Sequence, residues 1–328
     1  MADGSSGASG ARGRRRWWRP VLTGLCALLL LGPAVLAVVR VLGLDDGTVL
    51  ALPMAALPYA VLLALPAPVL LLMVRRRWFA AAAAVLVGLQ LWWLVPRAVP
   101  DGTDVPAGAP RLRVATSNAY MGGISPQSLV DLVRAQRVDA LAVEELSESA
   151  AAALDATGIR ALLPNREMPP GTDTAIYTRL PVTGAGDPAW PTTNVTVEVG
   201  GRPIVLVAVH TYYPLGDARK WAAGMRALRD AAPGRTGNAV LLGDFNATLD
   251  HAPMRDLLGT GLTDTHAELG AGLFPTWPED NRDLPFLPPV IQIDHVLHGG
   301  RLSAVSVEEF TLARTDHRAV VAELGVRS

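Results

Sequence analysis

The chain divides into two parts according to the pattern of its hydrophobic residues. The first part contains three uncharged apolar stretches, Val21–Val39, Thr48–Val74 and Trp78–Pro96. An α-helix needs about 20 apolar residues to cross the hydrocarbon core of a bilayer. We therefore expect residues 20–98 to form three transmembrane helices, the second of them kinked by its four prolines.

Arginines predict how these helices are oriented. Five arginines precede the first stretch, and Arg75–Arg77 separate the second from the third. Cytoplasmic loops are enriched in Lys and Arg, so we expect the N-terminus inside the cytoplasm and everything after Pro96 outside it. Residues 1–19 are predicted to be a disordered basic tail, and residues 99–110 a linker. A signal peptide is the alternative for the first stretch, but its apolar core is too long and two more stretches follow.

The second part, from residue 111 onward, alternates short apolar runs with segments of helical periodicity, which are typical of strands and amphipathic helices. Adjacent strands without an intervening helix, such as the pair around Gly200, indicate some antiparallel pairing. Residues 111–328 are therefore predicted to be an α/β domain with mixed β-sheets. The predicted helices are Pro126–Gln136 and Asp217–Ala231, and the predicted strands are Leu112–Thr116, Ala140–Val143, Ala175–Thr178, Val195–Val199, Ile204–Val209, Ala239–Leu242, Val290–Ile293, Ala304–Glu309 and Ala319–Glu323.

Charge is distributed unevenly between the two parts. Residues 1–110 carry 10 basic and 5 acidic residues, a balance of +5, whereas residues 111–328 carry 19 and 25, a balance of −6. Proteins that hold nucleic acid through its phosphates have a broad basic surface, so this balance argues against one unless a local patch or bound cations supply the attraction. The single cysteine, Cys26, permits neither an intrachain disulfide nor a thiolate metal site.

Acidic and amide residues follow two of the buried strands. Asp244 and Asn246 come two residues apart after Ala239–Leu242, so they project from the same face of an extended chain. A carboxylate and an amide there can bind a hard cation and orient a phosphate oxygen, although an Asx turn is the alternative for this segment alone. Glu144 and Glu145 follow another buried strand, where a carboxylate is a candidate Mg²⁺ ligand unless it only begins a helix.

Histidines and acids also stand next to strands later in the chain. His210 ends one apolar run, Asp294 and His295 follow another, and Asp316 and His317 precede the last strand. A His–Asp pair is a suitable general base, because the carboxylate fixes the imidazole tautomer and stabilises its charged form. A lone histidine is more often structural, and we interpret the remaining ones in that way: His251, His266 and His298.

Together these segments resemble the endonuclease/exonuclease/phosphatase superfamily, whose fold is that of deoxyribonuclease I. The resemblance covers about residues 110–326, and the motifs occur in the family's order. They are Arg113–Asn118, Val138–Leu146, Thr174–Pro181, Val209–Thr211, Gly243–Asn246, Ile293–His295 and Thr315–His317. The architecture implied by the resemblance is a four-layer α/β/β/α sandwich of two packed mixed sheets flanked by helices, with the site at one end.

The resemblance further implies a metal site. Glu145 would be the principal ligand of Mg²⁺, or of Mn²⁺ in its place, helped by Asn118 and Asp316. One or two metals are compatible with this pattern. Glu144 stands where members of the family usually have Gln, so the choice between Glu144 and Glu145 rests on the motif, which favours Glu145. His295 stands where an aromatic residue is frequent.

The catalytic roles implied by the resemblance fall on five residues. His317, held by Asp294, would activate the attacking water, and Asp244 would position or deprotonate that water. The resemblance leaves open whether Asp244 or His317 is the base. Asn246 would hold the scissile phosphate, and His210 would stabilise charge on the phosphate or on the leaving oxygen.

These features predict a multi-pass protein of the plasma membrane, anchored in the bilayer through residues 20–98, with a Mg²⁺-dependent phosphoesterase domain outside the cytoplasm. It would hydrolyse phosphodiester bonds as nucleases do; a lipid or sugar phosphodiesterase or phosphatase of the same fold is the alternative. The substrate would be nucleic acid or a phospholipid head group, and no obligate protein partner is expected.

A catalytically inactive binding module is an alternative of another class, disfavoured because every expected polar residue is present. A transporter is disfavoured because the three stretches contain no charge.

Overall fold

The chain folds into two compact units. One unit contains Leu42 and the chain before it together with Ala56–Leu94, and the other contains Gly43–Ala55 and everything from Val95 onward. The computed structural model describes residues 17–101, 105–232, 234, 236–279 and 287–327, so most of the predicted disordered tail lies outside the described residues.

The first unit is helical and apolar. Two described helices are long and apolar enough to cross a membrane, namely α1 (Trp18–Leu42) and the segment Arg77–Ala98, which begins with α5 (Arg77–Leu94). Between them lie the shorter α3 (Leu57–Ala64) and α4 (Ala67–Met73). Each of these two begins with a proline in its first turn, where the missing N–H costs no helical hydrogen bond.

The second predicted span, Thr48–Val74, is therefore not one helix. Its first eight residues belong to the other unit and include the short helix α2 (Ala51–Met54). The remaining stretch, Leu57–Met73, is apolar but falls below the length of α1 and α5. Both parts of Thr48–Val74 are apolar, so composition alone could not show that the first part belongs to the globular unit and the second to the apolar helices.

The second unit is built on two six-stranded mixed sheets. Each sheet has a single parallel pair, β1 with β2 and β7 with β8, and its other neighbours are antiparallel. The first sheet contains, in spatial order, β11 (Leu302–Thr311), β12 (Arg318–Val326), β1 (Arg111–Asn118), β2 (Ala140–Glu144), β4 (Ala175–Thr178) and β3 (Asn165–Glu167). The second contains β5 (Val182–Ala185), β6 (Asn194–Val199), β7 (Arg202–His210), β8 (Ala239–Asp244), β10 (Asp294–Gly299) and β9 (Leu262–Asp264).

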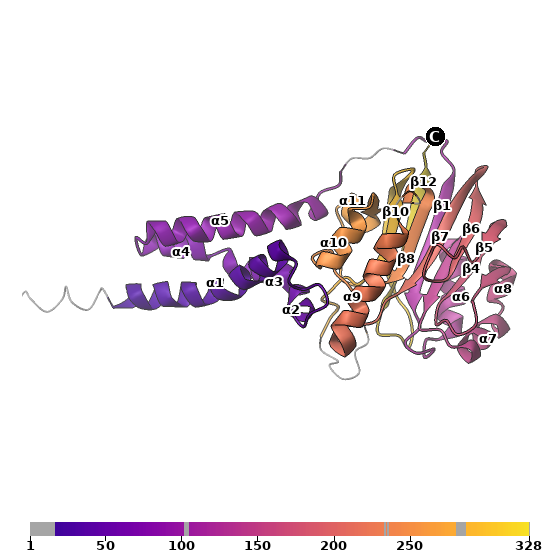
Figure 1. The fold of residues 1–328 in the computed structure, drawn as a ribbon, viewed down its shortest axis with the longest axis horizontal. Helices are drawn as coiled ribbons and strands as arrows, with labels where there is room; N and C mark the ends of the chain where they lie inside the picture. Colours follow the sequence, from indigo (N-terminus) through magenta and orange to yellow (C-terminus); the bar gives the residue numbers. More distant parts are fainter. Residues whose placement is uncertain (1–16, 102–104, 233, 235, 280–286, 328) are drawn as a thin grey trace, which may run out of the picture. The chain divides into compact units, whose positions relative to one another are not determined.

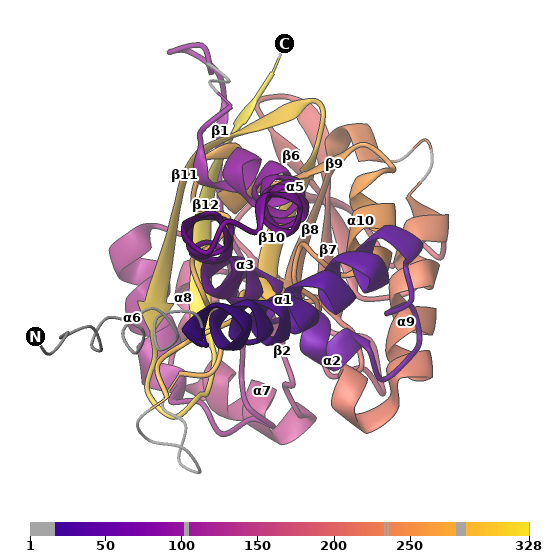
Figure 2. The same ribbon diagram turned by 90° about the vertical axis from the view of Figure 1, so that its left-hand side faces the viewer.

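Alternating side chains place an apolar core on each face of these sheets. In β1, for example, Val114 belongs to the core between the sheets, whereas Ala115 belongs to the core under the helices of the first sheet. The helices α6 (Pro126–Gln136) and α7 (Glu148–Ala156) lie on the opposite side of the sheets from α9 (Pro214–Ala231) and α10 (Ala252–Leu258) (Figures 1 and 2). The prediction of an α/β domain with two layered mixed sheets is confirmed. The helices of this unit other than α2 are α6 (Pro126–Gln136), α7 (Glu148–Ala156), α8 (Ile159–Leu162), α9 (Pro214–Ala231), α10 (Ala252–Leu258) and α11 (Thr265–Glu268).

One predicted strand is wrong. Val290–Ile293 forms only an isolated bridge, between Ile291 and Trp277, and the neighbouring strand β10 begins at Asp294. The hydroxyl of Thr276 accepts hydrogen bonds from the backbone N–H groups of Ile293 and Asp294, which takes the place of a sheet partner there. Asp294 therefore opens an antiparallel strand directly opposite Asp244 instead of following a strand.

The residues before the domain pack onto it. Arg97 makes a two-pronged ion pair with the buried Asp250, and the backbone N–H of Asp101 donates to the carbonyl of Glu268. Pro110 contacts the turn at Gly200. The described part of the predicted linker, residues 99–110, is thus bound to the globular unit, and the boundary of that unit lies before Val95 instead of at residue 111.

Gly243 is the position where the sheet allows no side chain. Its φ is +148°, and a Cβ atom would lie 1.9 Å from the carbonyl oxygen of Val209 on the neighbouring strand. We predict that Gly243→Ala lowers the free energy of unfolding by roughly 2–4 kcal/mol through strain and overpacking. Thermal unfolding of the detergent-solubilised chain measures this. Gly184→Ala is the matched control, because its Cβ would have 3.6 Å to the nearest atom, on Thr196; an equal effect of both substitutions would contradict the steric explanation.

Candidate active site

The two parallel strand pairs bring polar residues to one end of the sandwich. The register of β1 and β2 sets Asn118 beside Glu144, and the register of β7 and β8 sets His210 beside Asp244. Parallel strands end at the same edge of a sheet, so residues far apart in the chain meet there. The two sheets pack face to face through a shared core, and the site is assembled from residues at the same end of both.

Glu145, and not Glu144, enters the site. The backbone of Glu145 turns through a positive φ of 51°, and its carboxylate accepts hydrogen bonds from the Asn118 side chain at 3.1 Å and the Met121 backbone at 2.8 Å. Glu144 is buried and accepts a hydrogen bond from the Thr116 hydroxyl at 2.7 Å. Burial raises the pKa of Glu144 well above its ordinary value, which favours its neutral form.

Asp244 is the best-connected acid of the site. One of its oxygens accepts from the Asn118 side chain at 3.0 Å and from the Asn246 side chain at 3.2 Å, and the other accepts from the Asn246 backbone at 2.8 Å. The Asn246 amide also donates to the carbonyl of Thr211 at 3.1 Å. Burial raises the pKa of Asp244 to about 6, although the charge of the nearby His317 works in the opposite direction.

His317 and Asp294 form the expected pair. Nδ1 of His317 lies 3.0 and 3.1 Å from the two carboxylate oxygens of Asp294. Nε2 makes no hydrogen bond to any described residue and lies 3.9 Å from an oxygen of Asp244. Burial opposes a charged imidazole, but the acids Asp294 and Asp244 outweigh it and raise the pKa of His317 to about 10. A positive charge added to this cluster would lower that pKa again.

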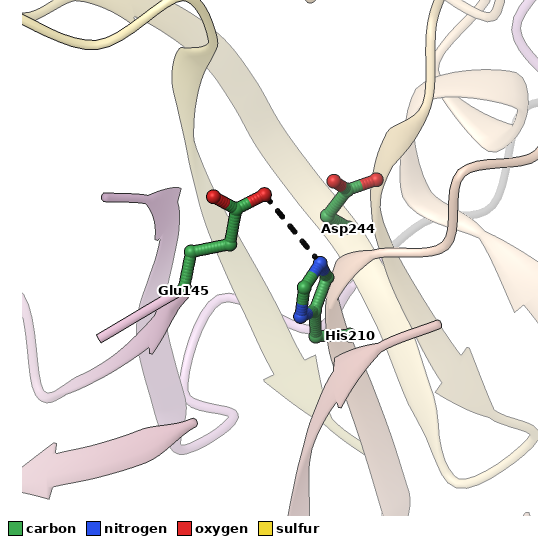
Figure 3. Close-up of side chains that lie close together, drawn as sticks. All are labelled: Glu145, His210 and Asp244. Carbon is green, nitrogen blue, oxygen red and sulfur yellow. Dashed lines mark ion pairs between the residues drawn. The ribbon is translucent and has the colours of Figure 1, made fainter. Parts of the chain in front are cut away.

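His210 lies between two acids on the other side of the site. Its Nδ1 is 2.7 Å from Asp173, and its Nε2 is 3.6 Å from Glu145. Figure 3 shows the ion pair of His210 with Glu145, and Asp244 nearby. Burial disfavours its charge, but the hydrogen bond to Asp173 and the charges of Asp244, Asp173 and Glu145 raise the pKa of His210 to about 9. Asp173 was not predicted, and its place just before the strand Ala175–Thr178 was the only signal for it.

The donors fit a divalent cation. Ligand atoms of Glu145, His210 and Asp244 lie within 4.8 Å of one another. In Asp316, one carboxylate oxygen accepts from the Trp277 indole at 3.1 Å, and the other is buried without a hydrogen-bond partner among the described residues. Carboxylate oxygens are the ligands that Mg²⁺ prefers. The buried oxygen of Asp316 lies 3.9 Å from Nε2 of His317, too far for a hydrogen bond, and a cation held by Glu145 and Asp316 would give it a direct contact and offset the repulsion among the acids.

The side-chain amide of Asn118 is not oriented as that of a metal ligand, which would turn its oxygen toward the cation. Its carbonyl oxygen accepts a hydrogen bond from the Tyr120 backbone at 2.8 Å, and its NH₂ group bridges Glu145 and Asp244. In this geometry Asn118 holds two carboxylates in place and presents nitrogen to them.

Trp277, which positions Asp316, was not predicted either, because nothing in its local sequence marks it.

A cavity of about 1040 Å³ opens onto these residues. Tyr212 and Tyr213 line it with their rings stacked, 4.8 Å between centroids, and Lys220 lies 4.2 Å above the Tyr212 ring. Two predicted site residues stand behind the lining and contact it indirectly, Asn118 through Asp244 and Asp294 through His317. The other six line the cavity directly: Glu145, His210, Asp244, Asn246, Asp316 and His317.

The remaining histidines make hydrogen bonds to residues other than those of the predicted site. His295 contacts Asp264 at 2.8 Å, and His266 and His298 contact acids in the same region. His251 is buried and contacts the carbonyl of Ala51 at 2.8 Å, although its ring also reaches the cavity wall. Arg179 lies outside the cavity lining and is paired with Asp139.

Comparison with known proteins identifies the family. Residues 115–317 match the model of the endonuclease/exonuclease/phosphatase family, and this range is more than half of the chain. The chain belongs to this family. The match begins within β1 and ends at His317, so it contains all the residues of the predicted site. The enzymes of the endonuclease/exonuclease/phosphatase family are metal-dependent phosphoesterases, and this chain is a hydrolase of that kind.

Solved structures of the endonuclease/exonuclease/phosphatase fold are similar to the chain. D. rerio TDP2 complexed with a single-strand DNA product has 15% identity and a TM-score of 0.55, over 66% of this chain and 99% of that one. A family member from Beutenbergia cavernae DSM 12333 has 18% identity and a TM-score of 0.51, over 67% and 72%. At these identities the likeness shows the fold alone. No protein of curated function matches the chain in sequence.

The neighbouring glutamates of this endonuclease/exonuclease/phosphatase member offer a matched test. We predict that Glu145→Gln lowers kcat/KM on the order of 100-fold, about 2.7 kcal/mol of transition-state stabilisation, because it removes a charge that faces the site. Glu144→Gln should keep activity within about twofold, because the replaced acid is buried, neutral and of the same shape. Steady-state hydrolysis of bis-p-nitrophenyl phosphate measures both, and the reverse order of effects would assign the site to Glu144.

Proposed function

We propose that this chain is a membrane-anchored, Mg²⁺-dependent phosphodiesterase that acts outside the cytoplasm. The observation that supports it best is the convergence of carboxylates around one cavity, with an oxygen of Asp316 that is buried and accepts no hydrogen bond from a described residue. Glu145 and Asp316 would hold the cation. When bound, the cation would neutralise charge that develops on the phosphate and lower the pKa of a coordinated water.

His317 is the base in this proposal. A cation bound by the neighbouring acids would lower the pKa of His317 from about 10. Nε2 could then accept a proton from water, while Asp294 keeps the proton of Nδ1 in place and stabilises the imidazolium. Both oxygens of Asp244 already accept hydrogen bonds from Asn246, and one also from Asn118, so Asp244 is better suited to orient the water and the neighbouring amides. The two roles that the sequence left open are assigned in this way.

His210 is the cationic group of the proposed mechanism. It carries a proton on the nitrogen that faces Asp173, and its other nitrogen points toward Glu145 and the cavity. A phosphodiester is anionic and repels a nucleophile, so a fixed positive charge beside it lowers the barrier. Asn246 would contact the phosphate from the turn after β8, once substrate competes for the amide that now bonds to Thr211.

Chain connectivity supports a membrane anchor with three crossings. Gly43–Ala55 and the domain after Val95 form one compact unit, so they lie on the same side of any membrane. The chain between them must then cross an even number of times. If α5 crosses, Leu57–Met73 crosses as well, and its 17 residues reach the lower end of the length needed. With the arginine clusters inside, the domain lies outside the cytoplasm.

Specific observations bear on two other functions, the hydrolysis of nucleic acid and binding without catalysis. Hydrolysis of nucleic acid has the single-strand DNA product bound to D. rerio TDP2 in its favour. The acidic balance of residues 111–328 works against it, because nucleic-acid sites depend on Lys and Arg. A catalytically inactive binding module would have no use for an unbonded His317 Nε2 facing a cavity, and the geometry favours the enzyme.

Removal of divalent cations tests the metal assignment. We predict that the detergent-solubilised full chain hydrolyses bis-p-nitrophenyl phosphate, that EDTA abolishes turnover, and that Mg²⁺ or Mn²⁺ restores it, because the acids need a cation to bind an anionic substrate. His317→Ala should lose on the order of 100-fold in kcat/KM in the presence of Mg²⁺. Full turnover in EDTA would refute the metal, and wild-type turnover of His317→Ala would remove this residue from the site.

Protease accessibility tests the topology. We expect a protease added to intact spheroplasts to digest residues 111–328, detected by loss of a C-terminal epitope, because the arginine clusters place this domain outside. A cytoplasmic reporter in the same cells should remain intact and serves as the control. Protection of the epitope until the membrane is permeabilised would reverse the orientation.

A further inference from the structure

The segment between α1 and α3 is fixed to the catalytic domain. Asp45 is fully buried and accepts a hydrogen bond from the Ala252 backbone at 2.7 Å, at the start of α10. The Ala51 carbonyl bonds to His251 at 2.8 Å, and the Ala51 side chain belongs to the core under the helices of the second sheet. Gly43–Ala55 is therefore an integral part of the globular unit.

This segment also forms one wall of the catalytic cavity. Ala51, Leu52 and Ala55 line the same space as Glu145 and His317. At about 1040 Å³ the cavity has the size of a pocket for an organic ligand, far beyond what a phosphate group fills. The substrate must therefore bring a substantial group besides the phosphate, and part of that group would contact the wall formed by Gly43–Ala55.

The rim of the cavity is apolar and exposed. Leu52 is 42% exposed, Met121 76%, Tyr213 50% and Leu215 74%, and they come from three separate segments. Among the described residues that line the cavity, Lys220 is the only lysine or arginine. Nucleic-acid sites have repeated cationic contacts to successive phosphates, whereas an exposed apolar rim marks a surface that binds an apolar group. The chemistry of the rim favours a substrate with hydrocarbon over a polyanion.

The wall is also continuous with the apolar helices. Gly43 directly follows α1, and Ala55 stands two residues before α3. The wall residues Ala51, Leu52 and Ala55 lie at most six residues before α3, roughly 20 Å even if fully extended, so the proposed anchoring keeps them near the bilayer. A lipid phosphate at the membrane surface is therefore the phosphate ester within reach of this cavity.

We infer that the cavity takes a membrane phospholipid, whose phosphate reaches the acidic floor while its hydrocarbon contacts the wall Gly43–Ala55 and the rim at Leu215. This inference rests on the proposed phosphoesterase function and names its substrate class. In the reaction, a water oxygen forms a bond to phosphorus and one P–O ester bond breaks. His317 accepts a proton from the water, and the departing oxygen gains a proton, so that an alcohol and a phosphate monoester are released.

The test compares one substrate with hydrocarbon and one without it. The full chain in detergent is assayed on bis-p-nitrophenyl phosphate, on single-stranded DNA, and on mixed micelles that contain phosphatidylglycerol, sphingomyelin or phosphatidylinositol phosphate. We expect hydrolysis of at least one lipid with a kcat/KM above that for DNA. Leu52→Gln and Leu215→Gln should lower the ratio of lipid to bis-p-nitrophenyl phosphate kcat/KM about tenfold, mainly through KM. Leu273→Gln is the matched control, because Leu273 is 45% exposed but lies outside the cavity lining.

The outcomes separate this inference from the proposed function. Turnover of bis-p-nitrophenyl phosphate that Glu145→Gln abolishes, without hydrolysis of any lipid, would overturn the lipid while leaving the phosphodiesterase in place. DNA as the best substrate would overturn it in favour of nucleic acid. An unchanged substrate ratio in both Leu52→Gln and Leu215→Gln, or an equal drop in Leu273→Gln, would remove the wall from substrate binding. No turnover of any substrate would refute the proposed function itself.

Discussion

Two side-chain contacts between the sheets hold the site together. Asn118, from the first sheet, donates to Asp244 of the second, and His317, at the start of the first sheet's β12, contacts Asp294 of the second. Each contact pairs a donor from one sheet with a buried acid from the other. Buried carboxylates destabilise a fold unless they are paired, so the packing of the two sheets and the chemistry of the site depend on each other. Small residues between the sheets, among them Ala142 and Ala208, allow the close approach.

Much of this arrangement could be predicted from the sequence because it depends on local pattern. The helix Pro126–Gln136 has the bounds that periodicity and its opening proline predicted. The strands β2 and β8 are apolar runs that end in acids, and parallel pairing of such strands brings their ends together wherever they stand in the chain. Glu145 and Asp244 reach the cavity for that reason. The order of the motifs along the chain then indicated the family, which no single motif could have identified.

What could not be predicted depends on contacts between distant segments. Thr48–Ala55 has the composition of a membrane helix, but it belongs to the globular unit, and only the contacts of Ala51 with His251 and with the core of the domain reveal this. Asp173 and Trp277 matter because they contact His210 and Asp316, and neither has a local signature. The place of Asp294 at the start of a strand follows from a hydrogen bond to Thr276, 18 residues away, which hydrophobic periodicity does not encode.

The points where the chain enters and leaves its apolar helices converge on one loop of the domain. Asp45, three residues after α1, bonds to Ala252, and Arg97, three residues after α5, makes a bidentate pair with Asp250. This loop directly follows Asn246, for which we propose a contact to the phosphate. A bidentate guanidinium–carboxylate pair tolerates little displacement, because both hydrogen bonds depend on one planar geometry. The turn at Asn246 is therefore fixed next to two of the three points where the chain passes between the globular unit and the apolar helices. A phosphate ester that reached this turn would do so beside residues that adjoin those helices in the sequence.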